Sequence, residues 1–442
     1  MERRLHATQP QPRFWRISRA GSELVIRSGA AGTPGTVNRI PCKSEEAAQK
    51  TFDGLVAQRL KDGFMDEAQA PSTLSVEAER ELLKDDPERW LVFADSLLET
   101  GDPVRGELIG LQVKAAKRAR GSIGQAKAFV KEHYDALIGA ELAGFHTQVT
   151  VEWRFGYART LRIWSGPYTA PIGEVLEAAL NSPASRFLER LEFGSPGTEG
   201  RYDVALKRLA SLEWPAHLAT LALGEFDVAE AFKNESAWPR IDSLLALQPV
   251  GSRLTTLEVR AALNTLGRGL ALPNLERLVL KPWRLDARLL TDLQSFEVPK
   301  LKTLSFTQEG VVGVTLAAWA SAIRRFLSHP GITRLELRRM REGAALLVLL
   351  DDLAGKLERV ELIGTPASEA HHLGPLRGTL KNVVFECPES GALARALQQL
   401  GLTAEGPSEE VVERKKKAKA ARAERAARRA DEDDERYDGV VE

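Results

Sequence analysis

Four charged residues around a predicted turn could form an acid–base cluster. They are Asp95, Glu99, Arg105 and Glu107. Neighbouring carboxylates can pass protons to and from a substrate, and a guanidinium can bind an anion. However, Asp102 stands directly before a proline, which is typical of a helix N-cap, so the cluster flanks a turn between two helices. We therefore expect Asp95 and Arg105 to pair or to cap near this turn, which is a structural role.

The histidines and cysteines give little support for a metal site. His371 and His372 form the only local histidine cluster, with Glu369 nearby. Adjacent residues on a regular element point apart, so the two rings are poorly placed to chelate one ion. Cys42 and Cys387 are far apart in sequence, which favours two small core residues over a disulfide or a zinc site. We predict no metal ion and no cofactor.

The motifs of several common enzyme classes are missing. The sequence has no G-x-x-x-x-G-K-[ST] loop, H-E-x-x-H helix, C-x-x-C pair or G-x-S-x-G elbow. These motifs mark phosphate binding, zinc chemistry, redox chemistry and nucleophilic catalysis. We therefore predict a protein that is not an enzyme and has no catalytic residues.

An apolar phrase that repeats along most of the chain must position any functional residue. The phrase L-x-x-L-x-L, with aliphatic or aromatic substitutions, recurs between Leu188 and Phe385 at a mean spacing of about 27 residues. Its central residues are Leu191, Leu221, Leu257, Leu278, Leu304, Leu335, Val360 and Val383. This period is typical of leucine-rich repeats, in which each repeat contributes one short strand. We therefore predict an α/β fold, a leucine-rich-repeat solenoid over residues 146–405.

Two details refine this expectation. The asparagine usual in the turns of such repeats is missing, so we predict an irregular solenoid with uneven helices. The clearest helix between strands spans residues 316–327, where apolar residues share one face and Thr315 can act as the N-cap.

Alternating residues of the later phrases should point away from the core, because side chains alternate along a strand. The outward residues that we predict as a protein-binding face are Thr256, Glu258, Arg260, Arg277, Lys281, Arg334, Glu336, Arg338, Arg359 and Glu361. We expect them on the concave strand face, where their arginines could bind carboxylates in pairs of hydrogen bonds. The alternative is that these charges only pair across neighbouring strands and keep the surface soluble.

The segment at about residues 12–70 shows a second, independent pattern. The positions that form it are Phe14, Trp15, Ile17, Arg27, Gly29, Gly32, Thr33, Gly35, Glu46, Ala47, Phe52, Gly63 and Phe64. This order resembles the WGR domain, known from poly(ADP-ribose) polymerases and many bacterial proteins, and implies a small α+β domain. The name-giving Trp-Gly-Arg triplet is Ser28-Gly29-Ala30 here. The family's Trp and Arg help to engage a DNA end in the polymerases, and Ser and Ala can neither stack on a base nor pair with a phosphate. We expect the fold to be kept and this DNA contact to be lost.

The stretch from Trp90 to Gln112 is a predicted helical hairpin. It strongly resembles a bacterial repeat-companion domain found ahead of leucine-rich repeats. The resemblance implies architecture, not activity. We expect residues 77–145 to form a helical capping region that packs against the N-terminal end of the repeats.

Charge and hydropathy limit the remaining possibilities. Sixty-one basic residues balance 61 acidic ones, so any attraction to nucleic acid must be local. Residues 1–11 are polar, and we predict them to be disordered. With no apolar run of about 18 residues, we expect a cytoplasmic protein without a membrane contact. The tail at 406–442 is charged and of low complexity, and its basic block offers a weak candidate nucleic-acid contact. That contact comprises Lys415, Lys416, Lys417, Lys419 and Arg422.

Two hypotheses of different classes follow. The first is a non-enzymatic cytoplasmic scaffold or adaptor that binds a protein through the repeat surface. The second is a nucleic-acid-associated factor that uses the WGR-like segment and the basic tail. The sequence leaves the identity of the partner open.

Overall fold

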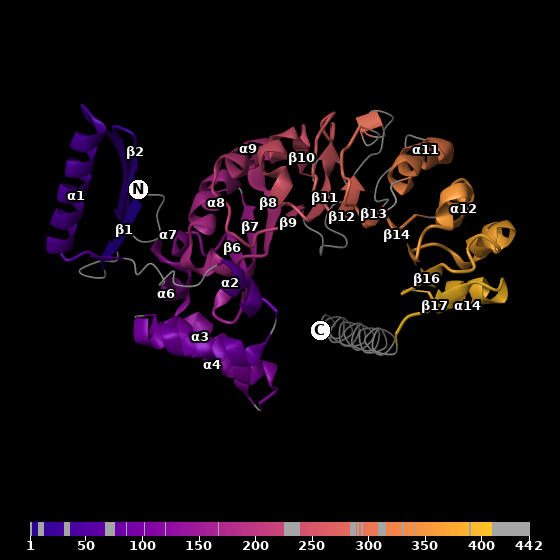
Figure 1. Cartoon of the computed structure of the whole chain (residues 1–442), viewed down its shortest axis with the longest axis horizontal. Helices are drawn as coiled ribbons and strands as arrows, with labels where there is room; N and C mark the ends of the chain where they lie inside the picture. The colour runs from indigo at the N-terminus through magenta and orange to yellow at the C-terminus, as the bar shows by residue number, and fades with distance from the viewer. Residues whose placement is uncertain are drawn as a thin grey trace, which may run out of the picture. The chain divides into compact units, whose positions relative to one another are not determined.

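The structure, a computed structural model, describes residues 2–7, 13–30, 36–66, 76–84, 86–100, 102–119, 121–166, 168–224, 239–282, 289, 291–292, 295–307, 315–328, 331–340, 342–388 and 390–408. The chain divides into two compact units, Met1–Leu272 and Pro273–Glu442 (Figure 1).

The first unit begins with a small antiparallel sheet and one helix. The strands are β1 (Glu2–Ala7), β2 (Arg13–Ala20), β3 (Glu23–Ala30), β4 (Thr36–Pro41) and β5 (Met65–Asp66), in the order β4-β3-β2-β1-β5, and the helix is α1 (Glu45–Lys61). Ser44 caps α1, because its hydroxyl accepts a hydrogen bond from the backbone N–H of Ala47 at 3.2 Å. Trp15, Ile17 and Phe52 are buried together, so this segment has a core of its own.

Residues 1–11, which we predicted to be disordered, contain strand β1. This strand pairs with β2 from Glu2 to Ala7, opposite Ser18 to Arg13. This pairing places β1 between β2 and β5 in the small sheet.

A group of helices follows the small sheet. They are α2 (Val76–Leu82), α3 (Pro87–Thr100), α4 (Pro103–Ala116), α5 (Ser122–Glu132), α6 (Tyr134–Ile138) and α7 (Ala140–Ala143). The α3–α4 hairpin is anchored by Trp90, whose side chain is fully buried. The centroid of the Trp90 ring lies 5.1 Å from that of Phe155 and 5.2 Å from that of Phe187. Contacts of this kind between large aromatic rings dominate core energetics, so the hairpin is packed against the start of the sheet that follows.

Arg105 ties this hairpin to its surroundings from inside the protein, where only 1% of it is exposed. Its Nε donates to Asp102 Oδ2 at 2.8 Å, and its two Nη groups donate to the carbonyls of Gly156 at 2.6 Å and Leu137 at 2.9 Å. Arg105 therefore pairs with Asp102, which also caps α4, and not with Asp95, which is exposed. The guanidinium has a structural role.

The rest of the first unit is a sheet with helices between its strands. Its strands are β6 (Val149–Arg154), β7 (Tyr157–Ser165), β8 (Arg190–Pro196), β9 (Thr220–Leu223) and β11 (Thr256–Leu263), in that order. Strand β10 (Arg240–Ile241) pairs with the end of β11. The connecting helices are α8 (Ile172–Leu180), η1 (Pro183–Phe187), η2 (Gly197–Glu199), α9 (Asp203–Ser211) and η4 (Leu244–Arg253). Strands β6 and β7 are antiparallel, and the pairs from β7 to β11 are parallel.

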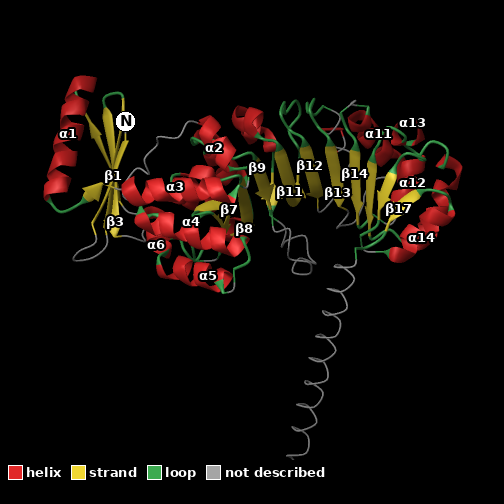
Figure 2. Cartoon of the chain, turned by 60° about the horizontal axis from the view of Figure 1, so that its bottom comes forward, coloured by secondary structure: helices red, strands yellow, loops and turns green. Residues whose placement is uncertain are grey.

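The second unit continues this pattern of parallel strands. They are β12 (Arg277–Pro282), β13 (Thr303–Thr307), β14 (Arg334–Arg338), β15 (Arg359–Ile363), β16 (Val384–Glu386) and β17 (Thr403–Glu405), in that order. Its helices are α11 (Leu316–Leu327), α12 (Gly343–Val348), α13 (Asp351–Ala354), η5 (Ala367–Leu376) and α14 (Gly391–Gln399). The helices gather along one face of the strands (Figure 2). Phe306 of β13 and Trp319 of α11 meet in this layer, with ring centroids 5.0 Å apart.

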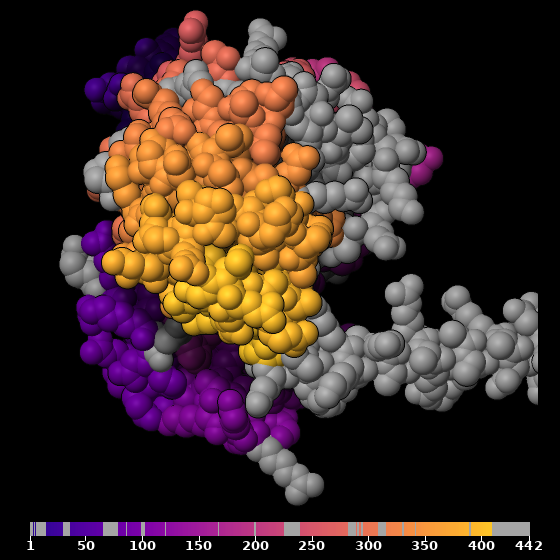
Figure 3. Space-filling view, turned by 90° about the vertical axis from the view of Figure 1, so that its right-hand side faces the viewer, coloured from indigo at the N-terminus to yellow at the C-terminus, as the bar shows by residue number. Residues whose placement is uncertain are grey.

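Strand β17 is the last strand in this order. Residues 390–408 form part of the surface at that end of the second unit (Figure 3). Thr403 and Glu405 are exposed, whereas Ala404 between them is buried. The alternation is that of a strand with one face on the core.

The prediction of an irregular leucine-rich-repeat solenoid is wrong. The structure is a mixed α/β fold with a large, mostly parallel sheet of twelve strands. The sheet starts with an antiparallel pair, and the segments between its parallel strands differ in kind. For example, α8 and η1 lie between β7 and β8, whereas α11 alone is described between β13 and β14. No single strand-and-helix unit is repeated along the described residues.

The physical reason is that an apolar phrase specifies a strand but not the connection that follows it. Seven of the eight predicted centres lie within strands, and Val383 lies one residue before β16. Alternating apolar residues decide which side of a strand is buried. The connections between the centres span from 21 to 36 residues and fold independently of the phrase.

Candidate functional site

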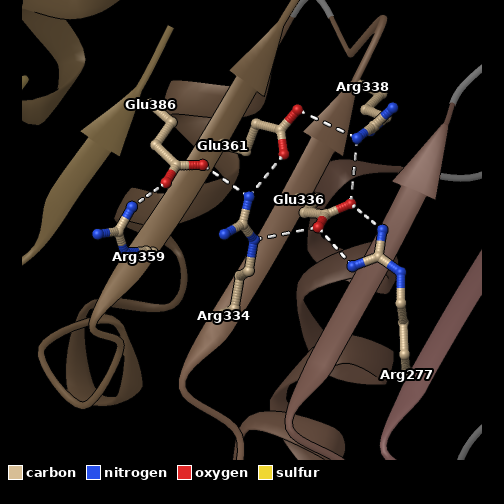
Figure 4. Close-up of polar contacts among 7 residues, drawn as sticks. All are labelled: Arg277, Arg334, Glu336, Arg338, Arg359, Glu361 and Glu386. Atoms are coloured by element: carbon tan, nitrogen blue, oxygen red, sulfur yellow. Dashed lines mark hydrogen bonds and ion pairs between the residues drawn. The ribbon is translucent and has the colours of Figure 1, made fainter. Parts of the chain in front are cut away.

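Arginines and glutamates of the second unit lie in rows across strands β12 to β16, on the face away from the helices (Figure 4). In the parallel register, Arg277, Thr303, Arg334 and Arg359 are aligned from β12 to β15. Two residues further along each strand, a second row contains Val279, Ser305, Glu336, Glu361 and Glu386. Because side chains two residues apart share a face, arginines and glutamates come into contact.

Glu336 is the centre of this arrangement. Arg277 reaches across β13 and donates from both Nη groups to the two Glu336 oxygens, at 2.7 and 2.8 Å. The strand that it crosses carries Ser305 at the matching position, a residue small enough to leave the path open. Arg334 Nε donates to the same carboxylate at 3.1 Å, and Arg338 Nη2 lies 3.4 Å from it. Three guanidiniums therefore surround one carboxylate.

The arrangement continues to β16 through two further carboxylates. Arg334 Nη2 donates to Glu361 at 3.1 Å and to Glu386 at 2.6 Å. Arg338 donates to Glu361 at 3.1 Å, and Arg359 donates to Glu386. We call these seven residues the arginine cluster. It consists of Arg277, Arg334, Glu336, Arg338, Arg359, Glu361 and Glu386.

Exposure differs sharply between the two charges of the arginine cluster. The side chains of Glu336 and Glu361 are only 2% and 7% exposed, whereas that of Arg359 is 48% exposed and those of Arg277, Arg334 and Arg338 are each about one-third exposed. The carboxylates of Glu336 and Glu361 thus lie beneath the guanidiniums, whereas the Glu386 side chain is 18% exposed. With four arginines and three glutamates, the arginine cluster carries one excess positive charge, and the exposed Glu405 of β17 lies next to Glu386 in the same row.

The electrostatics fit this geometry. Burial alone would raise the pKa of Glu336, but the hydrogen bond and positive charge of Arg277, with Arg338 beside it, lower it below its ordinary value. Burial works against the charged form of Arg334, yet its contacts with Glu361, Glu386 and Glu336 raise the pKa of this guanidinium. Both shifts favour the charged forms of Glu336 and Arg334.

A smaller cluster occupies the first unit. Arg190 of β8 donates to Glu192 at 2.6 Å and, across β9, to both oxygens of Glu258 at 3.0 and 2.8 Å. Arg162 donates to Glu192 at 2.8 Å. The crossed strand again carries a small residue, Ala222, at the matching position. These four residues, Arg162, Arg190, Glu192 and Glu258, form the balanced cluster, which has two charges of each sign.

The structure divides the predicted binding face between the two units. Arg277, Arg334, Glu336, Arg338, Arg359 and Glu361 come together in the arginine cluster, and Glu258 belongs to the balanced cluster. The other predicted residues are in neither cluster. Thr256 and Lys281 are half-buried near the ends of β11 and β12, and Arg260 is only 6% exposed.

Sequence reasoning missed four members of these clusters. Glu386 lies three residues after the predicted centre Val383, whereas Glu336 and Glu361 directly follow Leu335 and Val360. The register explains the difference, because Phe385 and not Val383 pairs with Val360. Arg162, Arg190 and Glu192 belong to earlier strands that we left out of the predicted face. The predicted tail contact, Lys415, Lys416, Lys417, Lys419 and Arg422, lies outside the described residues.

The histidines and cysteines considered as metal ligands form no metal-binding cluster in the part of the chain that the structure describes. No group of three or more His, Cys, Asp or Glu side chains there could hold a metal ion. His371 and His372 are ring neighbours, and His372 lies 3.8 Å from Glu369. Cys387 is buried, and burial raises the pKa of its thiol to about 11.

The small N-terminal sheet can now be compared with known families. The WGR domain family matches residues 1–71. This segment is a WGR domain. In the WGR domain, Arg16 lies 3.5 Å from Glu141, and Arg27 lies 4.0 Å from Glu177, carboxylates of the neighbouring helices α7 and α8. Ser28, at the first position of the name-giving triplet, is half-buried.

Comparisons of the whole chain with curated proteins and solved structures are less informative. No curated protein matches the sequence. A Bacteroides fragilis protein of known crystal structure is similar over 92% of this chain and 96% of its own, with 16% identity and a TM-score of 0.46. Within the described residues, no helix is long and apolar enough to cross a membrane.

Proposed function

We propose that this chain is a non-enzymatic scaffold or adaptor protein that binds an acidic segment of a partner protein through the arginine cluster. The observation that carries the proposal is that carboxylates lie in the inner layer of that face and guanidiniums in the outer layer. The nearly buried carboxylates of Glu336 and Glu361 hold Arg277, Arg334 and Arg338 in place, Glu386 holds Arg359, and the arginines form the outer layer. Side chains that are already fixed lose little conformational freedom when a partner binds.

The outer arginines keep hydrogen-bond donors for a partner. A guanidinium carries five N–H groups. In the described structure, Arg359 uses one nitrogen, Nη1, for its bond to Glu386. Its Nε and Nη2 have no acceptor among the described residues, and they form the edge that binds a carboxylate with two parallel bonds. Arg359 is therefore the proposed first contact for an Asp or Glu of the partner.

The helical hairpin has an architectural place in this proposal. Its resemblance to a repeat-companion domain implies no chemistry of its own. The large side chains of its inner face, which include Trp90 and Phe93, pack in the core of the first unit. The hairpin supports the sheet and leaves partner binding to other surfaces.

The test is a pull-down with the full chain as bait in a lysate of the organism that encodes it. Arg334→Glu combined with Arg359→Glu should remove specific partners that the unchanged chain retains. Arg325→Glu is the matched control, because Arg325 is exposed on α11, in the helix layer. Circular dichroism and a thermal melt check folding. Since Arg334 contacts buried carboxylates, Arg359→Glu alone is the variant to use if the double variant does not fold. Retention of every partner by a folded variant would refute the proposal.

The nucleic-acid alternative makes a different prediction. Arg16 and Arg27 of the WGR domain face carboxylates of the same chain, which offset their charge toward phosphate. Any strong binding must then come from the basic tail. DNA binding by the full chain and by a chain that ends at Pro407 should be compared at several salt concentrations, because phosphate contacts give a steep salt dependence. Tight binding that is lost with the tail would favour the alternative.

A further inference from the structure

A cavity of about 520 Å³ lies in the first unit between α4, α5 and the β6–β7 hairpin. This size is within the range of roughly 300–1,000 Å³ that is usual for small-ligand sites. Most of its wall is apolar and includes Ile123, Val130, Trp153 and Phe155. Ile123 is 59% exposed, which is unusual for isoleucine and marks the rim of the opening.

One wall of the cavity is fixed by strain and packing. Phe155 has a φ of +45°, a left-handed backbone conformation that is rare for a bulky residue. Its ring is 5.1 Å from the fully buried Trp90 ring, so the aromatic core holds the strained turn in place. A cavity with a rigid wall keeps its shape when it is empty.

The polar groups of the cavity are hydrogen-bond donors. Gln112 Oε1 accepts a hydrogen bond from the backbone N–H of Gly156 at 2.7 Å, so the amide group left for a ligand is Nε2, a donor. The charged residues in the lining are Lys127 and Arg154, both cations. Arg154 is bound to Glu189 and to the carbonyl of Leu83 at 2.6 Å. Lys127 forms no ion pair with any residue that the structure describes, and it is exposed at the mouth.

The surroundings add to this positive charge. Between Lys114 and Lys131 the sequence contains six Lys or Arg and no Asp or Glu, and one of the six, Lys117, is paired with Glu88 of α3. Such a run raises the local concentration of anions near the opening. An apolar interior, unpaired donors and a cationic rim together are complementary to one kind of molecule, an apolar chain that ends in a carboxylate.

We propose that this cavity binds an aliphatic carboxylate, with its chain between α5 and β6 and its carboxylate on the Lys127 ammonium. The site is separate from the arginine cluster and does not depend on the function proposed for it. Decanoate is the probe, and binding to the full chain is measured by isothermal titration calorimetry at 150 mM salt. Decanol and decyltrimethylammonium have the same chain length without the negative charge. One decanoate should bind per chain, and more tightly than either comparison compound.

Two pairs of variants locate the binding. Lys127→Glu should weaken decanoate binding by about ten- to a hundredfold, the usual range for a lost charge-assisted hydrogen bond. Lys131→Glu is its control, since Lys131 is exposed on the same helix but is not part of the cavity wall. Ile123→Asp should weaken binding more than Ile123→Asn, because the two differ mainly in charge.

Three results would overturn the proposal: no measurable decanoate binding, equal binding of decyltrimethylammonium, or equal losses in the Lys127 and Lys131 variants. The last result would mean that the basic run attracts anions without a defined site. Ile123 is a solvent-exposed position, so its variants are expected to fold and keep the test decisive even if a change at Lys127 alters α5.

Discussion

The two clusters on the strands share one construction but differ in charge balance and in burial. In each, an arginine reaches across a strand with a small residue, Ala222 or Ser305, and binds a glutamate with both Nη groups. The balanced cluster has two charges of each sign, and its Glu192 side chain is 16% exposed. The arginine cluster has four arginines and three glutamates, and its Glu336 side chain is 2% exposed.

Under the proposed function, the same strand register serves two purposes. Equal numbers of opposite charges pair with one another and leave little charge for a partner. Stability and solubility alone therefore account for the balanced cluster. The arginine cluster buries the carboxylates of Glu336 and Glu361, which costs desolvation free energy, and leaves cations outside. A surface that retains an excess of one charge is suited to a partner of the opposite charge.

The largest expected effect is on stability. Glu336→Gln should lower the free energy of unfolding by about 3–5 kcal/mol, because it leaves three guanidiniums around a buried neutral group. Glu192→Gln should cost only about 1 kcal/mol, since water screens the more exposed pair. Urea denaturation of both variants and of the unchanged chain measures the difference. Equal losses would show that the two clusters do not differ in burial energetics.

The pH dependence should reveal the same carboxylate. Because the pKa of Glu336 is lowered on folding, its ionised form stabilises the native state at pH values above the ordinary 4.5. That contribution is lost as the pH falls below 4.5 and through the folded-state pKa. The stability difference between the unchanged chain and Glu336→Gln should therefore be largest near pH 7 and should shrink in acid. Denaturation curves at pH 7, 5, 4 and 3 check this, and a constant difference would contradict it.

Binding of an acidic probe should separate the clusters by a smaller amount. Arg338→Gln should weaken the binding of a glutamate-rich peptide by about fivefold, which corresponds to about 1 kcal/mol for one partly exposed charge contact. Arg162→Gln in the balanced cluster should change the affinity by less than about twofold. Fluorescence anisotropy with a labelled peptide measures both. If the two variants bind equally well, the charge excess of the arginine cluster is not what the peptide recognises.

The smallest effect is a change in the rate of thiol labelling. Each unit has one cysteine, Cys42 in the first and Cys387, next to Glu386, in the second. Cys387 should react with Ellman's reagent more slowly than Cys42 at pH 8, because burial raises the pKa of its thiol to about 11. Glu336→Gln should speed up the labelling of Cys387 and leave that of Cys42 unchanged. Equal acceleration at both would mean that the substitution loosens the whole chain, and Cys42→Ser assigns the rates.

Local signals in the sequence predicted local structure well. Thr315 caps a helix over Leu316–Leu327, as the polar residue before an apolar stripe indicated. Ser44 likewise caps α1. These features depend on residues within one or two turns of each other, which the sequence displays directly. The WGR domain could be recognised for a related reason, because its pattern falls within one short segment.

Longer-range features could not be predicted in the same way. Asp95 and Arg105 were expected to pair or to cap near the turn. Arg105 pairs instead with Asp102 and donates to two carbonyls that come together only in the folded unit. The cavity beside α5 has no signature, since its walls come from α4, α5 and the β6–β7 hairpin, and its shape depends on the angles between them. The solenoid was wrongly predicted because the spacing between strands says little about the structure of the segments that connect them.

The sequence by itself located the strands around the apolar phrases and the side of each that is buried, because that information lies in the alternation of neighbouring side chains, but it missed β1. Only the tertiary structure decided which strands are adjacent and in what register. That register brings Arg277 to Glu336 across 59 residues of sequence, and Arg334 to Glu386 across 52. Such contacts depend on the hydrogen-bonded alignment of whole strands, and this alignment is set by the packing of every connection between them.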